Sequence, residues 1–209
     1  MTAKTLYKAK YISAEGKVGY KNIDGKMVTY FSKPMERYIV TDAKGDYKMY
    51  DPATNTVIRE LGMEYSSKYS FINCFMANKT SDMGLPNLGF KLSDVRTEDK
   101  LLIKNWIGSI VSKAGAATAE LVYENNLPIY IGIYNPKKEI DNKTYFGNYQ
   151  KVGNINFPMS VTEITFMTPQ DSSITKRTYS SPMFNEQADS KLIDFIIPSN
   201  AKVVTSPKK

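Results

Sequence analysis

Residues 33–57 constrain the fold most, because three short strand-like runs alternate there with two tight turns. The first turn reads Asp-Ala-Lys-Gly at 42–45, and the second reads Asp-Pro-Ala-Thr-Asn at 51–55. Asp and Asn side chains bond to nearby backbone in turns, glycine supplies positive φ, and proline fixes one φ. Runs this short, joined by loops this tight, must pair as antiparallel neighbours. The segment therefore predicts a β-meander with strands at 37–41, 47–50 and 56–59.

The chain on both sides of this segment repeats the pattern of short apolar runs and turn residues. Asp24-Gly25 is a two-residue hairpin signal. Gly16 is expected to interrupt the first strand, and Pro158 to break a long strand near its start. The stretch 112–117 predicts an exposed connection or a wide hairpin, 169–172 a turn, and 206–209 a mobile tail. Further strands are expected at 6–13, 18–22, 27–32, 90–96, 101–108, 118–123, 127–134, 143–151, 157–168, 173–179 and 192–197.

One segment departs from the strand pattern. After Gly62 the apolar side chains recur at three- to four-residue spacing, with serine, lysine and asparagine between them. This period is typical of an amphipathic helix, which we expect over 64–77. Its apolar stripe consists of Tyr65, Tyr69, Ile72 and Met76, broadened by Phe71 and Phe75.

These patterns predict a mainly β protein of about ten to twelve strands, without the βαβ rhythm of an α/β fold. A sheet with this many strands must curl. We therefore expect one strongly curved antiparallel sheet, an unclosed β-barrel, with the 64–77 helix as a lid on its concave side. At 209 residues the chain is expected to form a single domain, 1–209.

The composition excludes several kinds of chemistry. Histidine is absent, which removes Ser-His-Asp and Cys-His catalytic arrangements and histidine metal sites. Cys74 is the only cysteine, so neither an intrachain disulfide nor a cysteine metal cluster can form. No glycine-rich nucleotide-binding motif and no G-x-S-x-G occurs. We expect no enzymatic activity, no catalytic residue, no cofactor and no metal.

The formal net charge of +7 has two interpretations. It can serve solubility, or it can attract anionic lipid or nucleic acid. Lysines are scattered along the whole chain, and no stripe of basic residues can be placed on one element. The scatter favours solubility, and we expect no nucleic-acid partner.

No run of about eighteen apolar residues occurs, so nothing is expected to span a membrane. The first residues lack the apolar core of a signal peptide. A chain whose leader has been removed would look like this, and so would a cytoplasmic protein.

Two parts of the chain resemble a known family. In the first, Lys33-Pro34 precedes a strand and a glycine-containing turn, and the next, aromatic strand ends in Tyr50-Asp51-Pro52. In the second, an aromatic and apolar run from Phe195 to Pro198 is followed by small residues and Val204. Both resemble the LolA-type carriers of outer-membrane lipoproteins, the second resembling their closing strand.

The resemblance implies an unclosed barrel covered by helices that shuttles the acyl chains of lipoproteins or lipids through the periplasm. Inner- and outer-membrane transfer partners, a monomer and a periplasmic location with the signal peptide removed are expected on the same basis. Large aromatic side chains and adaptable methionines suit the lining of an apolar cavity, and ordinary core packing is the alternative role for each. The candidates are Tyr30, Tyr47, Met49, Phe71, Phe75, Met76, Trp106 and Tyr130.

Lys33 stands where the family has an arginine that bonds to the lid. Lysine keeps the charge but lacks the planar fork of donors, so a bidentate lid contact is not available. A lid contact and a solvated turn contact both stay open for Lys33. Two other functions also stay open. One is a lipid- or lipoprotein-sensing interaction domain on the same fold. The other is a lipocalin-like barrel, although the Gly-x-Trp that lipocalins carry near their amino end is missing.

Overall fold

The computed structural model describes residues 1–168 and 170–205. Within them the chain is mainly β, with fourteen strands and two short α-helices. The strands form one sheet in the open order β14-β6-β5-β4-β3-β2-β1-β13-β12-β11-β10-β9-β8-β7. These findings confirm the mainly β prediction. Residue 169 of the expected turn and the expected tail at 206–209 lie outside the described residues.

The chain divides into two compact units. Unit 1 contains Met1–Thr2, Ser13–Ala77 and the described residues from Ser181 onward, and unit 2 contains Ala3–Ile12 and Asn78–Ser180. Each unit is described by itself below. That 1–209 behaves as a single domain stays a prediction.

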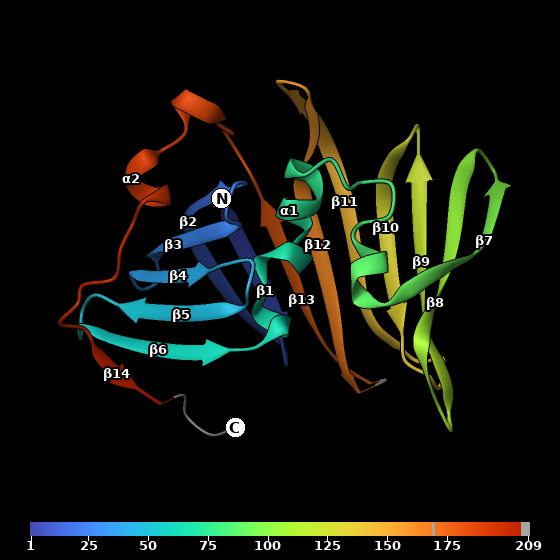
Figure 1. The fold of residues 1–209 in the computed structure, drawn as a ribbon, viewed down its shortest axis with the longest axis horizontal. Coiled ribbons are helices and arrows are strands. Elements are labelled where there is room, and N and C mark those ends of the chain that lie inside the picture. The colour runs from blue at the N-terminus through green and yellow to red at the C-terminus, as the bar shows by residue number, and fades with distance from the viewer. Residues whose placement is uncertain (169, 206–209) are drawn as a thin grey trace. The chain divides into compact units, whose positions relative to one another are not determined.

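Unit 1 contains the predicted meander (Figure 1). The three strands at its centre pair as antiparallel neighbours, Tyr38 opposite Tyr50 and Tyr50 opposite Val57. The prediction of antiparallel pairing is wrong only at β14, which runs parallel to β6. The strands of unit 1 are β2 (Lys10–Lys21), β3 (Lys26–Lys33), β4 (Arg37–Thr41), β5 (Asp46–Asp51), β6 (Thr56–Leu61) and β14 (Lys202–Val204).

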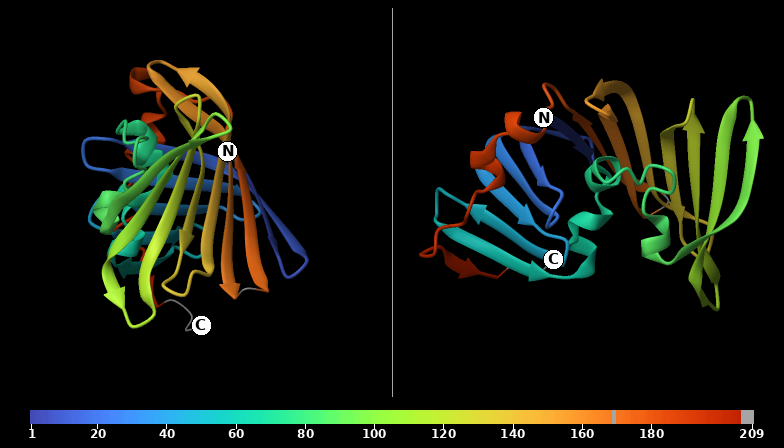
Figure 2. Two further views of the ribbon diagram at one scale, coloured as in Figure 1. Left: turned by 90° about the vertical axis from the view of Figure 1, so that its right-hand side faces the viewer. Right: turned by 45° about the horizontal axis from the view of Figure 1, so that its top comes forward.

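Unit 2 is a second antiparallel meander, whose strands lie side by side (Figure 2). The predicted strand at 6–13 is wrong, because Lys8 and Ala9 both have positive φ and form a hairpin turn there. Pro158 does not end its strand but lies buried within it, opposite Tyr149. The strands are β1 (Thr2–Tyr7), β7 (Phe90–Glu98), β8 (Leu101–Ser112), β9 (Gly115–Glu124), β10 (Leu127–Tyr134), β11 (Ile140–Val152), β12 (Ile155–Thr168) and β13 (Asp171–Thr178).

The predicted helix at 64–77 is wrong in its length. The segment forms two 3₁₀ turns, η1 (Met63–Tyr65) and η2 (Ser67–Tyr69), and then the short helix α1 (Phe71–Met76). Ser66 and Ser70 between them have extended backbones, and their hydroxyls accept the N–H groups of Lys68 and Asn73. Each serine therefore caps the next turn and prevents one continuous helix.

The predicted closing strand at 192–197 is also wrong. The chain forms the 3₁₀ turn η4 (Asn185–Gln187) and helix α2 (Ser190–Ile193), and Lys202–Val204 forms the last strand. The carboxylate of Asp189 accepts the backbone N–H of Leu192 and so caps α2. The cap thus begins a helix that includes Leu192 and Ile193, and residues 195–198 after it form neither helix nor strand.

The α2 segment covers one face of the unit 1 sheet, and the side chains packed between the segment and the sheet form the core of unit 1. Leu192 is buried there, and the ring of Phe195 stacks on Tyr38 with centroids 3.9 Å apart. Lys17 forms an ion pair with Asp189 at 3.1 Å. Val28 and Val57 on this face are fully buried. We call this face the α2 face.

The core of unit 2 lies on one face of its sheet, under the loop that precedes β7. The hydroxyl of Tyr123 donates to the carbonyl of Thr80 at 2.9 Å, and the ammonium of Lys104 donates to that of Ser81 at 2.8 Å. The 3₁₀ turn η3 (Leu85–Leu88) then buries Leu85 completely. These bonds fix the loop at the position where it shields the apolar side chains of the sheet.

Replacing Asp189 with alanine tests how α2 is held. The hydrogen bond from Lys17, and then that from the Leu192 N–H, lower the pKa of Asp189. Such a carboxylate stabilises the fold above its unfolded pKa of about 3.9, and the stabilisation is lost as the pH falls through the folded pKa. We expect Asp189→Ala to unfold at lower denaturant concentration than the wild type at pH 7, with a smaller difference at pH 3. An equal difference at both pH values would contradict this account.

Candidate functional site: the apolar face beside helix α1

The second face of the unit 1 sheet carries a row of side chains, one from each strand. The register places Thr29 opposite Ile39, Ile39 opposite Met49, and Met49 opposite Ile58. Directly opposite residues project from the same face of a sheet. Every member is half-buried or exposed. We call this set the central row: Val18, Thr29, Ile39, Met49, Ile58 and Val204.

Helix α1 lies at one end of this face. The hydroxyl of Tyr20 donates to Oδ1 of Asn73 at 2.6 Å, which ties α1 to β2. The rings of Tyr47 and Tyr65 are 5.0 Å apart, which ties η1 to β5. Asn73 is buried, and Phe75 of α1 is 1% exposed. The helical segment therefore covers one end of the face with its own packed contacts.

Two glycines and two serines position this segment. Gly62 donates to the carbonyl of Gly45 at 3.1 Å, and a Cβ on Gly45 would lie 2.1 Å from the Gly62 oxygen. Gly45 also has a φ of +85°, which glycine adopts without strain. The hydroxyl of Ser66 then donates to Ala43 at 2.8 Å, and that of Ser67 donates to the carbonyl of Gly25. The chain is thereby held across the face directly after β6.

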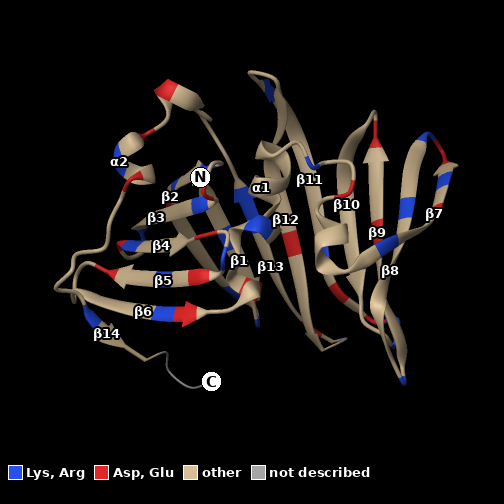
Figure 3. Cartoon of the chain, viewed as in Figure 1, with Lys and Arg blue, Asp and Glu red and all other residues tan. Residues whose placement is uncertain are grey.

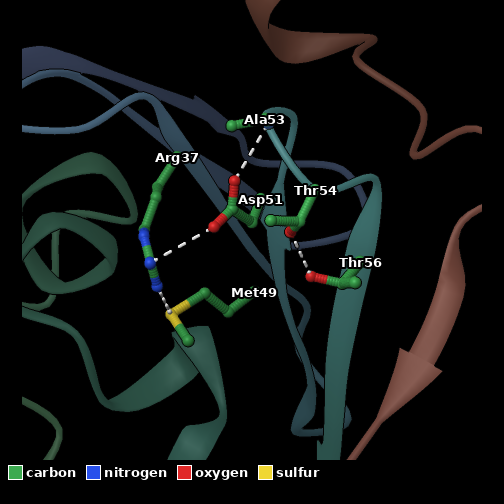
Figure 4. Close-up of polar contacts among 6 residues, drawn as sticks. All are labelled: Arg37, Met49, Asp51, Ala53, Thr54 and Thr56. Carbon is green, nitrogen blue, oxygen red and sulfur yellow. Dashed lines mark hydrogen bonds and ion pairs between the residues drawn. The ribbon is translucent and has the colours of Figure 1, made fainter.

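A charged group lies at the other end of the face (Figure 4). Nη2 of Arg37 donates to Oδ2 of Asp51 at 3.3 Å, and Nη1 lies 3.8 Å from the sulfur of Met49. Oδ1 of Asp51 accepts the N–H of Ala53 at 3.0 Å. The turn after β5 thus orients the carboxylate, and the carboxylate orients the guanidinium next to the central row.

Two polar atoms on this face are buried without a hydrogen-bond partner among the described residues. They are Nε of Arg37, at the charged end, and Oγ1 of Thr41, in the row nearest α1. An unpaired buried polar atom costs free energy comparable to a lost hydrogen bond. Arg37 Nε can donate to a ligand oxygen, and the Thr41 hydroxyl can donate or accept.

The tyrosines beside α1 keep their protons at neutral pH. Burial raises the pKa of Tyr47, and the nearby carboxylate of Glu60 raises it further. For Tyr65 the hydrogen bond with Glu60 is the largest cause of a raised pKa, followed by burial. The phenols of Tyr47 and Tyr65 are therefore neutral at the α1 end of the face, beside the carboxylates of Glu60 and Glu64.

Solved structures share this fold at low sequence identity. A LolA superfamily protein from Nitrosomonas europaea aligns with a TM-score of 0.53 at 9% identity, over 87% of this chain and 84% of that chain. The chain shares the fold of that LolA superfamily protein. No family model matches the chain. A search of curated proteins likewise found no match.

Two further structures agree with this result. A DUF1329 family protein from Desulfovibrio piger has a TM-score of 0.59 at 16% identity, over 92% of this chain and 87% of that chain. A domain from Vibrio parahaemolyticus, described as an outer membrane lipoprotein-sorting protein, has a TM-score of 0.56 at 15% identity, over 91% and 87%. At these identities the likeness concerns the LolA fold alone.

In this LolA fold, five of the eight predicted cavity residues belong to the α1 side of unit 1. Tyr47 and Met49 lie on the sheet face, and Phe71, Phe75 and Met76 lie in α1. Phe75 is buried, whereas Phe71 and Met76 are half-buried.

The other three predicted residues lie elsewhere. Tyr30 projects from the α2 face, where its ring is 4.7 Å from that of Tyr38 and its hydroxyl donates to Glu36 at 3.2 Å. Trp106 and Tyr130 belong to unit 2 and project from opposite faces of its sheet, because Tyr130 is in register with Ile103, three residues before Trp106. Ligand binding by these three stays a prediction, and no one face of a sheet holds all eight residues.

Lys33 forms an ion pair with Glu15 on the neighbouring strand at 3.1 Å. Both side chains are more than half exposed. This is the geometry of a solvated contact beside a turn, and such surface pairs contribute little to stability.

Ile39, Ile58 and Arg37 were missed as site residues. The signal was present, since the alternation within 37–41 and 56–59 already separates two faces. Choosing which face stays open needs the position of α2, and this depends on contacts distant in the sequence.

The structure shows no sign of two other kinds of site. Within residues 1–168 and 170–205 no group of three or more potential metal-ligating side chains gathers. Over the same residues, no helix has the length and apolar character needed to cross a bilayer.

The bond between Tyr20 and Asn73 can be tested by Tyr20→Phe, which keeps the ring and removes the hydroxyl. We expect a loss of about 1 kcal/mol in unfolding free energy, the usual contribution of such a bond. Amide hydrogen exchange should accelerate in α1, whereas the strands of unit 2 should keep wild-type rates. Unchanged protection of α1 would show that the bond does not hold the helix in place.

Proposed function

We propose that this protein is a non-enzymatic periplasmic carrier that binds the acyl chains of lipoproteins or lipids and passes them toward the outer membrane. The central row beside α1 is the observation that carries the proposal. The LolA fold supports it, since one structure with this fold is described as a lipoprotein-sorting protein. The proposal includes a curved, unclosed half-barrel with a helical cover, transfer partners in both membranes, and a monomeric state.

The dimensions of the central row suit an extended hydrocarbon chain. The row crosses the neighbouring strands β2, β3, β4, β5, β6 and β14. At about 4.8 Å between strands it extends for about 24 Å, comparable with a long acyl chain. Each methylene group withdrawn from water contributes about 0.8 kcal/mol. Burial of the hydrocarbon chain is the main source of affinity at such a site, and no bond chemistry is needed.

The polar atoms of the face suit the polar end of the same ligand. An ester- or amide-linked acyl group carries carbonyl oxygens beside its hydrocarbon chain. Nε of Arg37 is a buried donor beside Met49. A carbonyl oxygen there would satisfy this donor, and the flexible thioether of Met49 can adapt to different chains.

A single charge placed in the central row provides a test. Ile58→Glu puts a carboxylate among apolar side chains, so binding of a fluorescent fatty-acid probe should weaken about tenfold or more, because the charge must be buried under the ligand. Leu61→Glu is the matched control, since Leu61 lies on the same strand, projects from the opposite face and is 79% exposed. It should bind the probe as the wild type does.

Melting temperatures measured for both variants separate binding from stability. Ile58 is only half-buried, so we expect a decrease of a few degrees for Ile58→Glu and less for Leu61→Glu. No probe binding by the wild type would remove the carrier proposal and leave a lipid- or lipoprotein-sensing interaction domain. Equal binding by both variants would show that the ligand lies elsewhere.

A further inference from the structure

The two ends of the unit 2 strands differ in composition. Successive antiparallel strands are joined by hairpins that alternate between the ends (Figure 2). At one end the turns joining β7 to β8, β9 to β10 and β11 to β12 present only polar residues and glycine. These are Asp99, Lys100, Asn125, Asn126, Gly153 and Asn154.

The opposite end combines exposed apolar side chains with lysines. Among the described residues of unit 2, the four most exposed large apolar side chains all lie there. Ile110 is 88% exposed and Val111 71%, next to the turn that joins β8 to β9. Tyr11 is 78% exposed and Ile12 58%, next to the turn that joins β1 to β2. Met167, near the end of β12, is also exposed.

Strand order and contacts place these turns at the same end. Gly115, beside the first turn, lies against the carbonyl of Pro136 in the turn that joins β10 to β11, since a Cβ there would be 3.4 Å from that oxygen. Strand β1 is the neighbour of β13, and the hydroxyls of Thr5 and Thr175 are 3.0 Å apart. The turn at Lys8 therefore lies beside Asp171, where β13 begins.

We call this end, made of 8–12, 110–114, 135–141, 167–168 and 170–171, the lysine end. Lysine side chains outnumber carboxylates among its described residues, and Lys113 lies in the turn between β8 and β9. Figure 3 colours the basic residues blue and the acidic residues red along these strands. The lysines are Lys8, Lys10, Lys113, Lys137 and Lys138, all exposed, and the carboxylates are Glu139, Asp141 and Asp171.

We propose that the lysine end docks on the surface of an anionic lipid bilayer. Exposed isoleucine, valine and tyrosine side chains next to lysines are the combination that inserts at the boundary between headgroups and acyl chains. Apolar side chains scattered singly need no explanation. Here they occur as adjacent exposed pairs beside lysines, at two turns on the same end of the sheet, which is an arrangement that a flat bilayer surface can contact at both turns. The lysines add attraction to anionic headgroups, and the hairpin tips enter the interface without exposing unpaired strand edges.

Co-sedimentation with vesicles tests the proposal. The wild type should bind vesicles of phosphatidylglycerol and phosphatidylcholine, and should bind pure phosphatidylcholine vesicles at least about tenfold more weakly. Raising the salt concentration from about 0.1 M to 1 M should weaken the binding, because the screening length falls from about 10 Å to 3 Å.

Two pairs of variants separate the apolar and basic contributions. The double variant Ile110→Ser, Val111→Ser should reduce vesicle binding about tenfold or more. Its matched control is Ile23→Ser, which changes an equally exposed isoleucine of unit 1. The double variant Lys137→Glu, Lys138→Glu should reduce vesicle binding by a similar factor. Its matched control is the double variant Lys100→Glu, Lys151→Glu, which changes two lysines at the opposite end of the strands. All these positions are exposed, so circular dichroism should show the wild-type fold.

The outcomes decide the proposal without reference to acyl-chain binding. Loss of vesicle binding in the lysine-end variants, with vesicle binding by the control variants unchanged, supports it. Failure of the wild type to bind anionic vesicles overturns it. Equal losses in the variants and their controls also overturn it, because charge or apolarity anywhere on the surface would then be enough.

Discussion

The close approach of Gly45 and Gly62 is the constraint on which the candidate site depends. Their backbone bond continues the β5–β6 pairing by one residue, in a place where a Cβ on Gly45 would collide with the Gly62 carbonyl. The chain leaves β6 at this point and crosses the sheet face as η1, η2 and α1. Ser66 and Ser67 then anchor it to the turns at Ala43 and Gly25. The approach sets where the chain leaves the sheet, and the contacts of the two serines and of Tyr20 with Asn73 then hold the helical segment beside the central row.

The two faces of the unit 1 sheet differ in how much of each is covered by packed side chains. Leu192 and Phe195 seal the α2 face with apolar contacts, assisted by the ion pair between Lys17 and Asp189. On the other face, the α1 segment packs at one end only, through Tyr20 and Tyr47. The sealed face supplies the stability that allows the other to keep half-exposed apolar side chains. An open face of this kind costs burial that ordinary core packing would have gained.

Local turn chemistry made much of the fold predictable. The strands predicted at 37–41 and 127–134 agree with the structure, because Asp42, Gly45 and the Asn-Asn turn at 125–126 act on neighbouring residues. The failures concern capping and distant contacts. Ser66 and Ser70 divided the predicted helix, and the Asp189 cap and the stacking of Phe195 on Tyr38 replaced the predicted closing strand. Neither the open face nor the lysine end is visible in sequence, since each gathers residues that are far apart along the chain.

Photo-crosslinking with a diazirine-labelled fatty acid tests the central claim most directly, because it reports where an acyl chain lies. After irradiation, proteolysis and mass spectrometry locate the adducts. We expect adducts at Ile39, Met49 or Ile58, and unlabelled fatty acid should compete them away. Adducts confined to Tyr38 and Phe195 on the sealed face, or labelling that unlabelled fatty acid does not reduce, would contradict the claim that the central row binds acyl chains.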